Sequence, residues 1–193
     1  MRGEIDAAPP LRLCAGLLAD AFVDEPGMRW ICGPGLPRKR RWFAATTHAH
    51  VSLPGHRAYV ISGDGVPVGA ALAGPSGGRL GLRARVEWTA RVCAGCGPGA
   101  VRRTLAYLAA VEDGVPGGAW SLEFVGVSPT ARGRGAARAL IERVVGDAAG
   151  ADVVLTTADP ANVGVYRRLG FVETGRVRLA DLSVVTMRRA GST

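Results

Sequence analysis

The chain contains no hydrophobic run long enough to cross a membrane. None of the apolar stretches in its 193 residues approaches the roughly 20 residues that a membrane-spanning helix needs. The opening residues, MRGEIDAAPP, carry acids and prolines where a secretory signal peptide would have an apolar segment. We therefore expect a cytoplasmic protein with no membrane partner, and the length suits one domain with a single core.

Metal-binding motifs are missing as well. Only four cysteines are present, and the CxxC pair of Cys93 and Cys96 has no second pair of ligands at similar spacing, which a structural zinc site requires. His48 and His50 lie two residues apart, which places them on different sides of a helix and excludes an HExxH arrangement. We expect no bound metal.

Lysine is nearly absent, since Lys39 stands against 23 arginines, and the formal net charge is +8. A basic protein attracts nucleic acids, acidic membrane surfaces or phosphorylated small molecules, and charge alone does not choose among them. The arginines are spread along the chain, and the one dense cluster, RKRR at 38–41, is typical of a solvated helix face. Nucleic-acid binding is therefore not favoured.

The order of the expected elements indicates an α/β (α+β) class with a mixed sheet. Helical spacing predicts helices over 11–23, 37–54, 133–146 and 161–169, and two helices within 79–112 separated at 93–100. Strand patterns cover 57–62, 66–74, 120–127 and 152–158, with a closing pair after residue 170. The segment EPGMRW at 25–30 is typical of a turn, and no strand is evident in the first ten residues.

Residues 127–140, VSPTARGRGAARAL, join a predicted strand to a predicted helix through two glycines. Pro129 helps to end the strand because proline has no N–H for a sheet ladder. The first turn of the following helix presents unpaired N–H groups and the positive end of its dipole, which together can bind an anion. Gly133 and Gly135 leave those amides uncovered. We expect a phosphate cradle; the alternative is a helix start with solvated arginines.

Neither common nucleotide motif fits this loop. A P-loop needs Gly-Lys-Ser/Thr, which is absent, and Arg138 stands where a GxGxxG fingerprint needs glycine or alanine. The spacing Arg132-x-x-Gly135-x-Ala137 instead resembles the R/Q-x-x-G-x-G/A pattern of the Gcn5-related N-acetyltransferase (GNAT) family, whose loop amides hold the pyrophosphate of acetyl-CoA. Residues 120–189 resemble the core of that family.

The resemblance extends to particular runs of sequence. NVGVYRRLGF at 162–171 is similar to the Asn-x-x-x-Tyr-x-x-x-Gly-Phe run of the puromycin acetyltransferase-like branch, and AFVDEPGMRW at 21–30 resembles that branch's first helix and turn. It implies a single N-acetyltransferase domain over 1–193, with an acceptor-binding half at 1–118 and an acyl-CoA-binding core at 119–193. The implied fold is a mixed, twisted central sheet flanked by helices, with splayed central strands that hold acyl-CoA.

Acetyl transfer to an amine requires an amine that has lost a proton, a stabilised carbonyl oxygen and a protonated leaving thiolate. By resemblance, Tyr166 protonates the CoA sulfur and Asn162, four residues earlier on one helix face, binds the pantetheine arm. Packing between helix and sheet is the alternative role for the tyrosine. The resemblance also implies that the amides of Val125 and Val127 hold acetyl carbonyl and pantetheine, through a bulge next to Gly126. The loop residues implied to bind CoA are Arg132, Gly133, Arg134, Gly135, Ala136 and Ala137.

Glu123 is the candidate base, as a carboxylate in an otherwise apolar strand. Burial raises a carboxylate's pKa toward the range useful for taking a proton, and pairing with an arginine is the alternative. The branch often has a glutamate in Leu-Glu-Thr-Ser, where this chain has LTTA at 155–158, so that carboxylate is missing. Asp24 and Glu25 could attract a cationic amine or could be solvated turn residues.

The sequence thus predicts an acetyl-CoA-dependent N-acyltransferase that acts directly on a primary amine of a small molecule. No acylated intermediate is expected, because neither Cys93 nor Cys96 has a histidine nearby in sequence. The alternatives are an acyl-CoA-binding regulatory protein without turnover, or an acetyltransferase of protein- or RNA-linked amines. The amine, the acyl length and the oligomeric state stay open, with a homodimer among the options.

Overall fold

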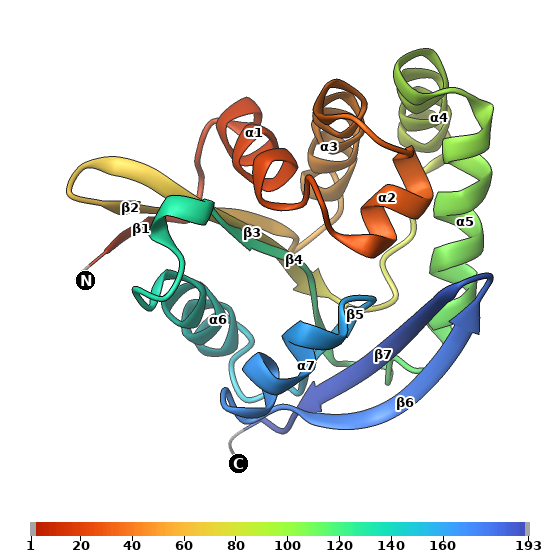
Figure 1. The fold of residues 1–193 in the computed structure, drawn as a ribbon. Helices are drawn as coiled ribbons and strands as arrows, with labels where there is room; N and C mark the ends of the chain where they lie inside the picture. The colour runs from red at the N-terminus through yellow and green to blue at the C-terminus, as the bar shows by residue number, and fades with distance from the viewer. Residues whose placement is uncertain (1–2, 192–193) are drawn as a thin grey trace.

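The computed structural model describes residues 3–191, which form one sheet with helices on both faces (Figure 1). The seven strands lie in the order β1-β2-β3-β4-β5-β7-β6. Every neighbouring pair is antiparallel except β4 and β5, which are parallel. The strands are β1 (Glu4–Asp6), β2 (Arg57–Gly63), β3 (Val66–Pro75), β4 (Trp120–Val127), β5 (Val153–Thr157), β6 (Val172–Leu179) and β7 (Leu182–Arg189). The predicted mixed α/β class is confirmed.

Two hydrophobic clusters lie on opposite faces of the sheet. On one face α1 and α3 pack against β2 and β3, with α4 and α5 beyond them, while α6 packs on the other face (Figure 1). The helices are α1 (Leu11–Ala21), α2 (Pro26–Cys32), α3 (Leu36–Val51), α4 (Leu82–Cys96), α5 (Pro98–Glu112), α6 (Ala136–Asp147) and α7 (Pro160–Arg167). No helix of residues 3–191 is long and apolar enough to span a membrane.

Three local predictions were wrong. The segment expected to be a turn forms α2, because the carboxylate of Glu25 caps the N–H of Met28 and Pro26 occupies the first turn. Strand β1 does form, but its three residues are too few to leave an alternating pattern. Helix α6 begins at residue 136 and not at 133, since the glycines before it take positive φ values and a 3₁₀ turn, Pro129–Ala131, comes first.

The arginine-rich cluster is also not a uniformly solvated face. Lys39 is fully buried, and its Nζ donates to the carbonyl of Gly33 at 3.0 Å. The side chain of Arg38 donates to the carbonyl of Cys96. Two of the four basic residues therefore fasten α3 to its neighbours, and α3 offers a weaker cationic surface than its sequence suggests.

Strands β4 and β5 separate soon after they meet. They pair only at Trp120 with Val153 and at Ser121 with Val154, whereas β4 stays paired with β3 up to Val127. From Leu122 onward the other edge of β4 has no strand beside it among the residues that the structure describes. This divergence is the splay that the resemblance implies.

Strand β4 carries a bulge at Glu123. Phe124 pairs with Leu72 and Leu122 pairs with Ala73, so Glu123 is left without a cross-strand partner. Leu122 packs into the cluster with α6, and Phe124 packs into the cluster with α3 on the opposite face. The bulge expected next to Gly126 was misplaced, because that residue pairs in regular register. The extra residue turns the Glu123 carboxylate toward α3.

Candidate active site

A cavity of about 590 Å³ opens beside the free edge of β4. Four segments line it: the connection between α1 and α2, the end of β4, the glycine loop with the start of α6, and α7 (Figure 1). The predicted site residues that line it are Val125, Val127, Arg132, Gly133, Gly135, Ala136, Ala137, Asn162 and Tyr166. Arg134 and Glu123 are not among the lining residues. The fold therefore brings most of the predicted set around one space.

The glycine loop has the backbone shape of an anion cradle. Gly133 and Gly135 have φ values of +76° and +86°, a conformation that residues with a Cβ adopt only at a cost. A Cβ built at either residue meets nothing within 4 Å, so backbone conformation and not crowding requires glycine here. No side chain caps the first turn of α6, which leaves its leading N–H groups facing the cavity.

Arg132 holds the walls of the cavity together. Its Nε donates to the carbonyl of Val127 at 3.5 Å and its Nη2 donates to the carbonyl of Ala21 at 3.3 Å. The side chain therefore links the end of β4 to the end of α1. It adds positive charge beside the loop from a position that these two contacts hold.

Helix α7 presents Tyr166 to the cavity. Burial raises the pKa of the Tyr166 phenol, and the negative charges of Glu25 and Asp159 raise it further. Asp159 caps α7 by accepting from the N–H of Ala161 at 3.0 Å. The ring of Phe171 meets the tyrosine ring edge-on, with centroids 5.9 Å apart. A phenol in this setting is neutral near pH 7 and has a proton to give.

Glu25, which the sequence left as either an attractor of a cationic amine or a solvated turn residue, lies at the site. It lines the cavity, and its Oε2 accepts from the N–H of Met28 at 2.6 Å. Burial raises the pKa of its carboxyl, two backbone N–H groups oppose that shift, and the charge of Asp159 adds to it. The signal in the sequence was a glutamate before a proline, which is typical of a helix start, but nothing local indicates that this start faces a cavity.

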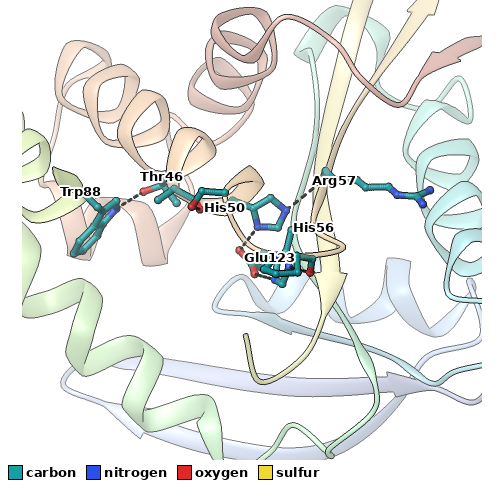
Figure 2. A network of polar contacts seen from close by, with 9 residues as sticks. Thr46, His50, His56, Arg57, Trp88 and Glu123 are labelled. Atoms are coloured by element: carbon teal, nitrogen blue, oxygen red, sulfur yellow. Dashed lines mark hydrogen bonds and ion pairs between the residues drawn. The ribbon is translucent and has the colours of Figure 1, made fainter. Parts of the chain in front are cut away.

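Glu123 pairs with two histidines (Figure 2), and no arginine among residues 3–191 forms an ion pair with it. Its Oε2 lies 3.0 Å from Nδ1 of His50, and its Oε1 lies 3.9 Å from Nε2 of His56. Burial lowers the pKa of His50, but the hydrogen bond and charge of Glu123 outweigh burial and hold it above its ordinary value. Both histidines are distant from Glu123 in sequence, so this pairing was missed.

Comparison with known proteins agrees with the geometry. The sequence profile of the acetyltransferase (GNAT) family matches residues 27–171. The chain belongs to the GNAT acetyltransferase family. No curated protein sequence matches it.

Solved GNAT structures share the fold of this acetyltransferase. A histone acetyltransferase HPA2 and related acetyltransferase from Corynebacterium glutamicum is 20% identical, with 100% of this chain and 98% of that one covered at a TM-score of 0.67. A ribosomal-protein-alanine N-acetyltransferase from Brucella melitensis is 18% identical, with coverages of 97% and 99% and a TM-score of 0.57. The NatC complex bound to Gag peptide and CoA is 14% identical, with coverages of 100% and 100% and a TM-score of 0.52.

Family membership makes this protein an acetyltransferase, and the family uses acetyl-CoA as its donor. The likeness to the puromycin acetyltransferase-like branch stays a prediction. The CxxC pair takes no part in the cavity of this acetyltransferase: Cys93 is exposed, and Cys96 is buried beside Cys32. The hydrogen bond from Cys32 lowers the pKa of the Cys96 thiol to about 7.

Proposed function

We propose that this GNAT acetyltransferase moves an acetyl group from acetyl-CoA directly to a primary amine of a small molecule. The observation that carries the proposal is a single cavity that joins the glycine loop, the free edge of β4 and the half-buried side chain of Tyr166. These are the three parts that a thioester donor needs: an anion cradle, a slot for the pantetheine arm and an acid beside the sulfur.

The donor fits the chain's own groups. The pyrophosphate would lie on the amides that follow Gly135, at the positive end of the α6 dipole. The N–H of Ser128 donates to the carbonyl of Val68 on β3 at 2.8 Å. Successive N–H groups of a strand point to opposite edges, so the amides of Val127 and Val125 point to the edge that β5 has left. Pantetheine would bind them there, with Asn162 on the facing helix.

Tyr166 is proposed as the acid that protonates the departing CoA sulfur. It lines the cavity, and its raised pKa keeps the proton on the phenol until a thiolate forms. A purely structural tyrosine between helix and sheet would not need to face an open cavity.

Two carboxylates compete for removal of the amine proton. We favour Glu25, because it lines the same cavity as Tyr166 and burial raises its pKa toward the range of a useful base. Asp24 and Asp159 also line that part of the cavity, and their charge favours a cationic amine. Glu123, the base that the sequence predicts, remains the alternative; its two carboxylate oxygens face histidines.

The test is release of free CoA against a panel of amines, with acetyl-CoA and longer acyl-CoA donors. The panel holds polyamines, amino acids, amine antibiotics and short peptides, so that protein-type acceptors are tried beside small molecules. We expect turnover with a small cationic amine. No release with any acceptor, together with acetyl-CoA binding, would establish the rival function of an acyl-CoA-binding protein without turnover.

Two matched variants then identify the base. Glu25→Gln and Glu123→Gln each replace a carboxylate by an amide of the same shape. We expect Glu25→Gln to lower kcat by about 10²- to 10⁴-fold, the range of general base catalysis, with acetyl-CoA binding retained. If kcat falls only in Glu123→Gln, the base is Glu123, at the bulge of β4.

A further inference from the structure

Three potential metal ligands meet on the face of the sheet that α3 covers. His50 lies near the end of α3, His56 lies in the connection that leads to β2, and Glu123 is the bulge residue of β4 (Figure 2). One ligand atom from each lies within 4.8 Å of the other two. The histidine side chains are 1% and 4% exposed, and that of Glu123 is 32% exposed. The cluster is therefore buried on the histidine side and open to solvent on the carboxylate side.

The hydrogen bonds of the two rings decide which nitrogen atoms are free. Nε2 of His50 lies 3.1 Å from the carbonyl of Arg57, and Nδ1 of His56 lies 3.2 Å from the carbonyl of Pro54. A carbonyl only accepts, so these two nitrogens donate and carry the hydrogen. The other nitrogen of each ring, Nδ1 of His50 and Nε2 of His56, is turned to the carboxylate of Glu123.

This is the pattern of metal-bound histidines, which bind the ion through one nitrogen and donate the other N–H to a carbonyl or carboxylate. On the ring of His50 an acceptor faces both nitrogens, the carbonyl of Arg57 on one side and the carboxylate of Glu123 on the other. A neutral imidazole has one hydrogen and cannot serve both. Either a second proton or a cation must lie between His50 and Glu123.

The fold also fixes the position of the His56 ring. A Cβ built at Gly74 would lie 2.5 Å from Cγ of His56, so the ring packs directly on the backbone of β3 and only glycine leaves it room there. The two imidazoles meet edge-on, with centroids 4.8 Å apart. The ligand atoms are thus held in place before any ion binds.

We propose that His50, His56 and Glu123 form a Zn²⁺ site. Two imidazole nitrogens and one carboxylate oxygen are a zinc donor set with a fourth position open to water. Ligand atoms about 2.1 Å from a tetrahedral zinc ion lie about 3.4 Å from one another. Nδ1 of His50 and Nε2 of His56 lie 3.0 Å and 3.9 Å from different oxygens of Glu123. One ligand atom from each of the three residues lies within 4.8 Å of the others, so side-chain shifts of about 1 to 1.5 Å complete the geometry.

A zinc ion at this point would join the acceptor-binding half to the acyl-CoA-binding core, since His50 and His56 precede β2 and Glu123 lies on β4. The zinc ion would also bind the Glu123 carboxylate, which could then not accept a proton from the amine. The sequence predicted no metal because the three residues share no spacing motif; the fold alone brings them together. The proposal goes beyond acetyl transfer and holds whichever amine is the acceptor.

The test uses the full chain, freed of metal with a chelator and then dialysed against Zn²⁺ or Co²⁺. We expect one ion per chain, a rise in the unfolding temperature on addition of Zn²⁺, and a cobalt spectrum without thiolate charge-transfer absorption. His56→Gln should weaken binding by at least about 100-fold, the upper range for loss of a group that supports a metal site. His48→Gln is the matched control on α3, because that histidine is half exposed and lies outside the cluster.

Several results would overturn the proposal. They are no uptake at micromolar Zn²⁺, equal uptake by His56→Gln and the parent, or a cobalt spectrum with thiolate absorption that disappears in Cys93→Ser or Cys96→Ser. If His56→Gln does not fold, Glu123→Gln gives the same comparison, since an amide keeps the shape and is a poor zinc ligand. If NMR finds His50 doubly protonated in the metal-free chain, and its signals do not change when Zn²⁺ is added, His50 and Glu123 form an ion pair without a metal. None of these readouts depends on turnover.

Discussion

Replacing Gly135 with alanine tests whether the glycine loop has the conformation described. Gly135 caps α6 with φ +86° and ψ 0°, the left-handed region, where a Cβ costs about 1–2 kcal/mol. Nothing lies within 4 Å of that added atom, so no steric term is added to the conformational one. The expected loss of stability is therefore about 1–2 kcal/mol.

The matched control is Gly146→Ala in the same helix. Gly146 lies within α6, and its added Cβ also meets nothing within 4 Å. Alanine is favoured there by up to about 1 kcal/mol, so the two changes should have opposite signs. At roughly 2–4 °C per kcal/mol for a chain of this size, thermal unfolding should separate the two variants by several degrees. Gly135→Ala should also raise KM for acetyl-CoA, because the new methyl group lies at the cradle.

A Gly135→Ala variant that unfolds at or above the parent temperature would contradict the left-handed conformation at Gly135. A variant that is destabilised by the expected amount but keeps the parent KM for acetyl-CoA would contradict only the role of the loop as an anion cradle. In that second case the loop would have the described backbone, and the pyrophosphate would bind elsewhere.

Three further predictions concern single side chains. The raised pKa of Glu25 means that the folded chain binds this proton more tightly than the unfolded chain. This tighter binding of the proton stabilises the folded chain at pH values below the ordinary carboxyl pKa. The stabilisation is lost as the pH rises through the raised pKa of Glu25 in the folded chain. Glu25→Gln should therefore gain in Tm relative to the parent across that window; a constant difference would contradict the shift. Asp159→Ala removes the cap on the N–H of Ala161 and should cost about 1 kcal/mol in chemical unfolding, whereas no loss would mean that the cap is not formed. Tyr59→Phe removes the 2.9 Å bond from the phenol to Asp147 and should cost about 1 kcal/mol; a neutral result would show that water replaces it.

Sequence patterns were sufficient for the long elements and for the local structure of the segments that line the cavity from β4 to α7. The strand at 120–127, the loop with its glycines and the helix face shared by Asn162 and Tyr166 are local, since each depends on residues close together in the chain. Apolar periodicity, glycine and proline report such local structure directly.

The surroundings of Glu25 and Glu123 could not be predicted, because they depend on contacts between distant segments. Glu25 and Tyr166 line one cavity only because the start of α2 and α7 come together in the fold. Glu123 meets His50 from 73 residues away. The bulge that aims Glu123 at α3 depends on the register with β3, which no single strand encodes. The sequence showed that Glu123 is a carboxylate in a strand, but it did not show that two histidines lie beside it.

Tyr166→Phe tests whether the cavity carries out acetyl transfer with Tyr166 as its acid. Initial rates of CoA release and equilibrium binding of acetyl-CoA are measured on the same preparations of parent and variant. We expect kcat to fall by about 10²- to 10⁴-fold, because a general acid is lost, while acetyl-CoA binds as before. A variant that releases CoA at the parent rate would contradict the assignment of the cavity as the site of acetyl transfer with Tyr166 as its acid.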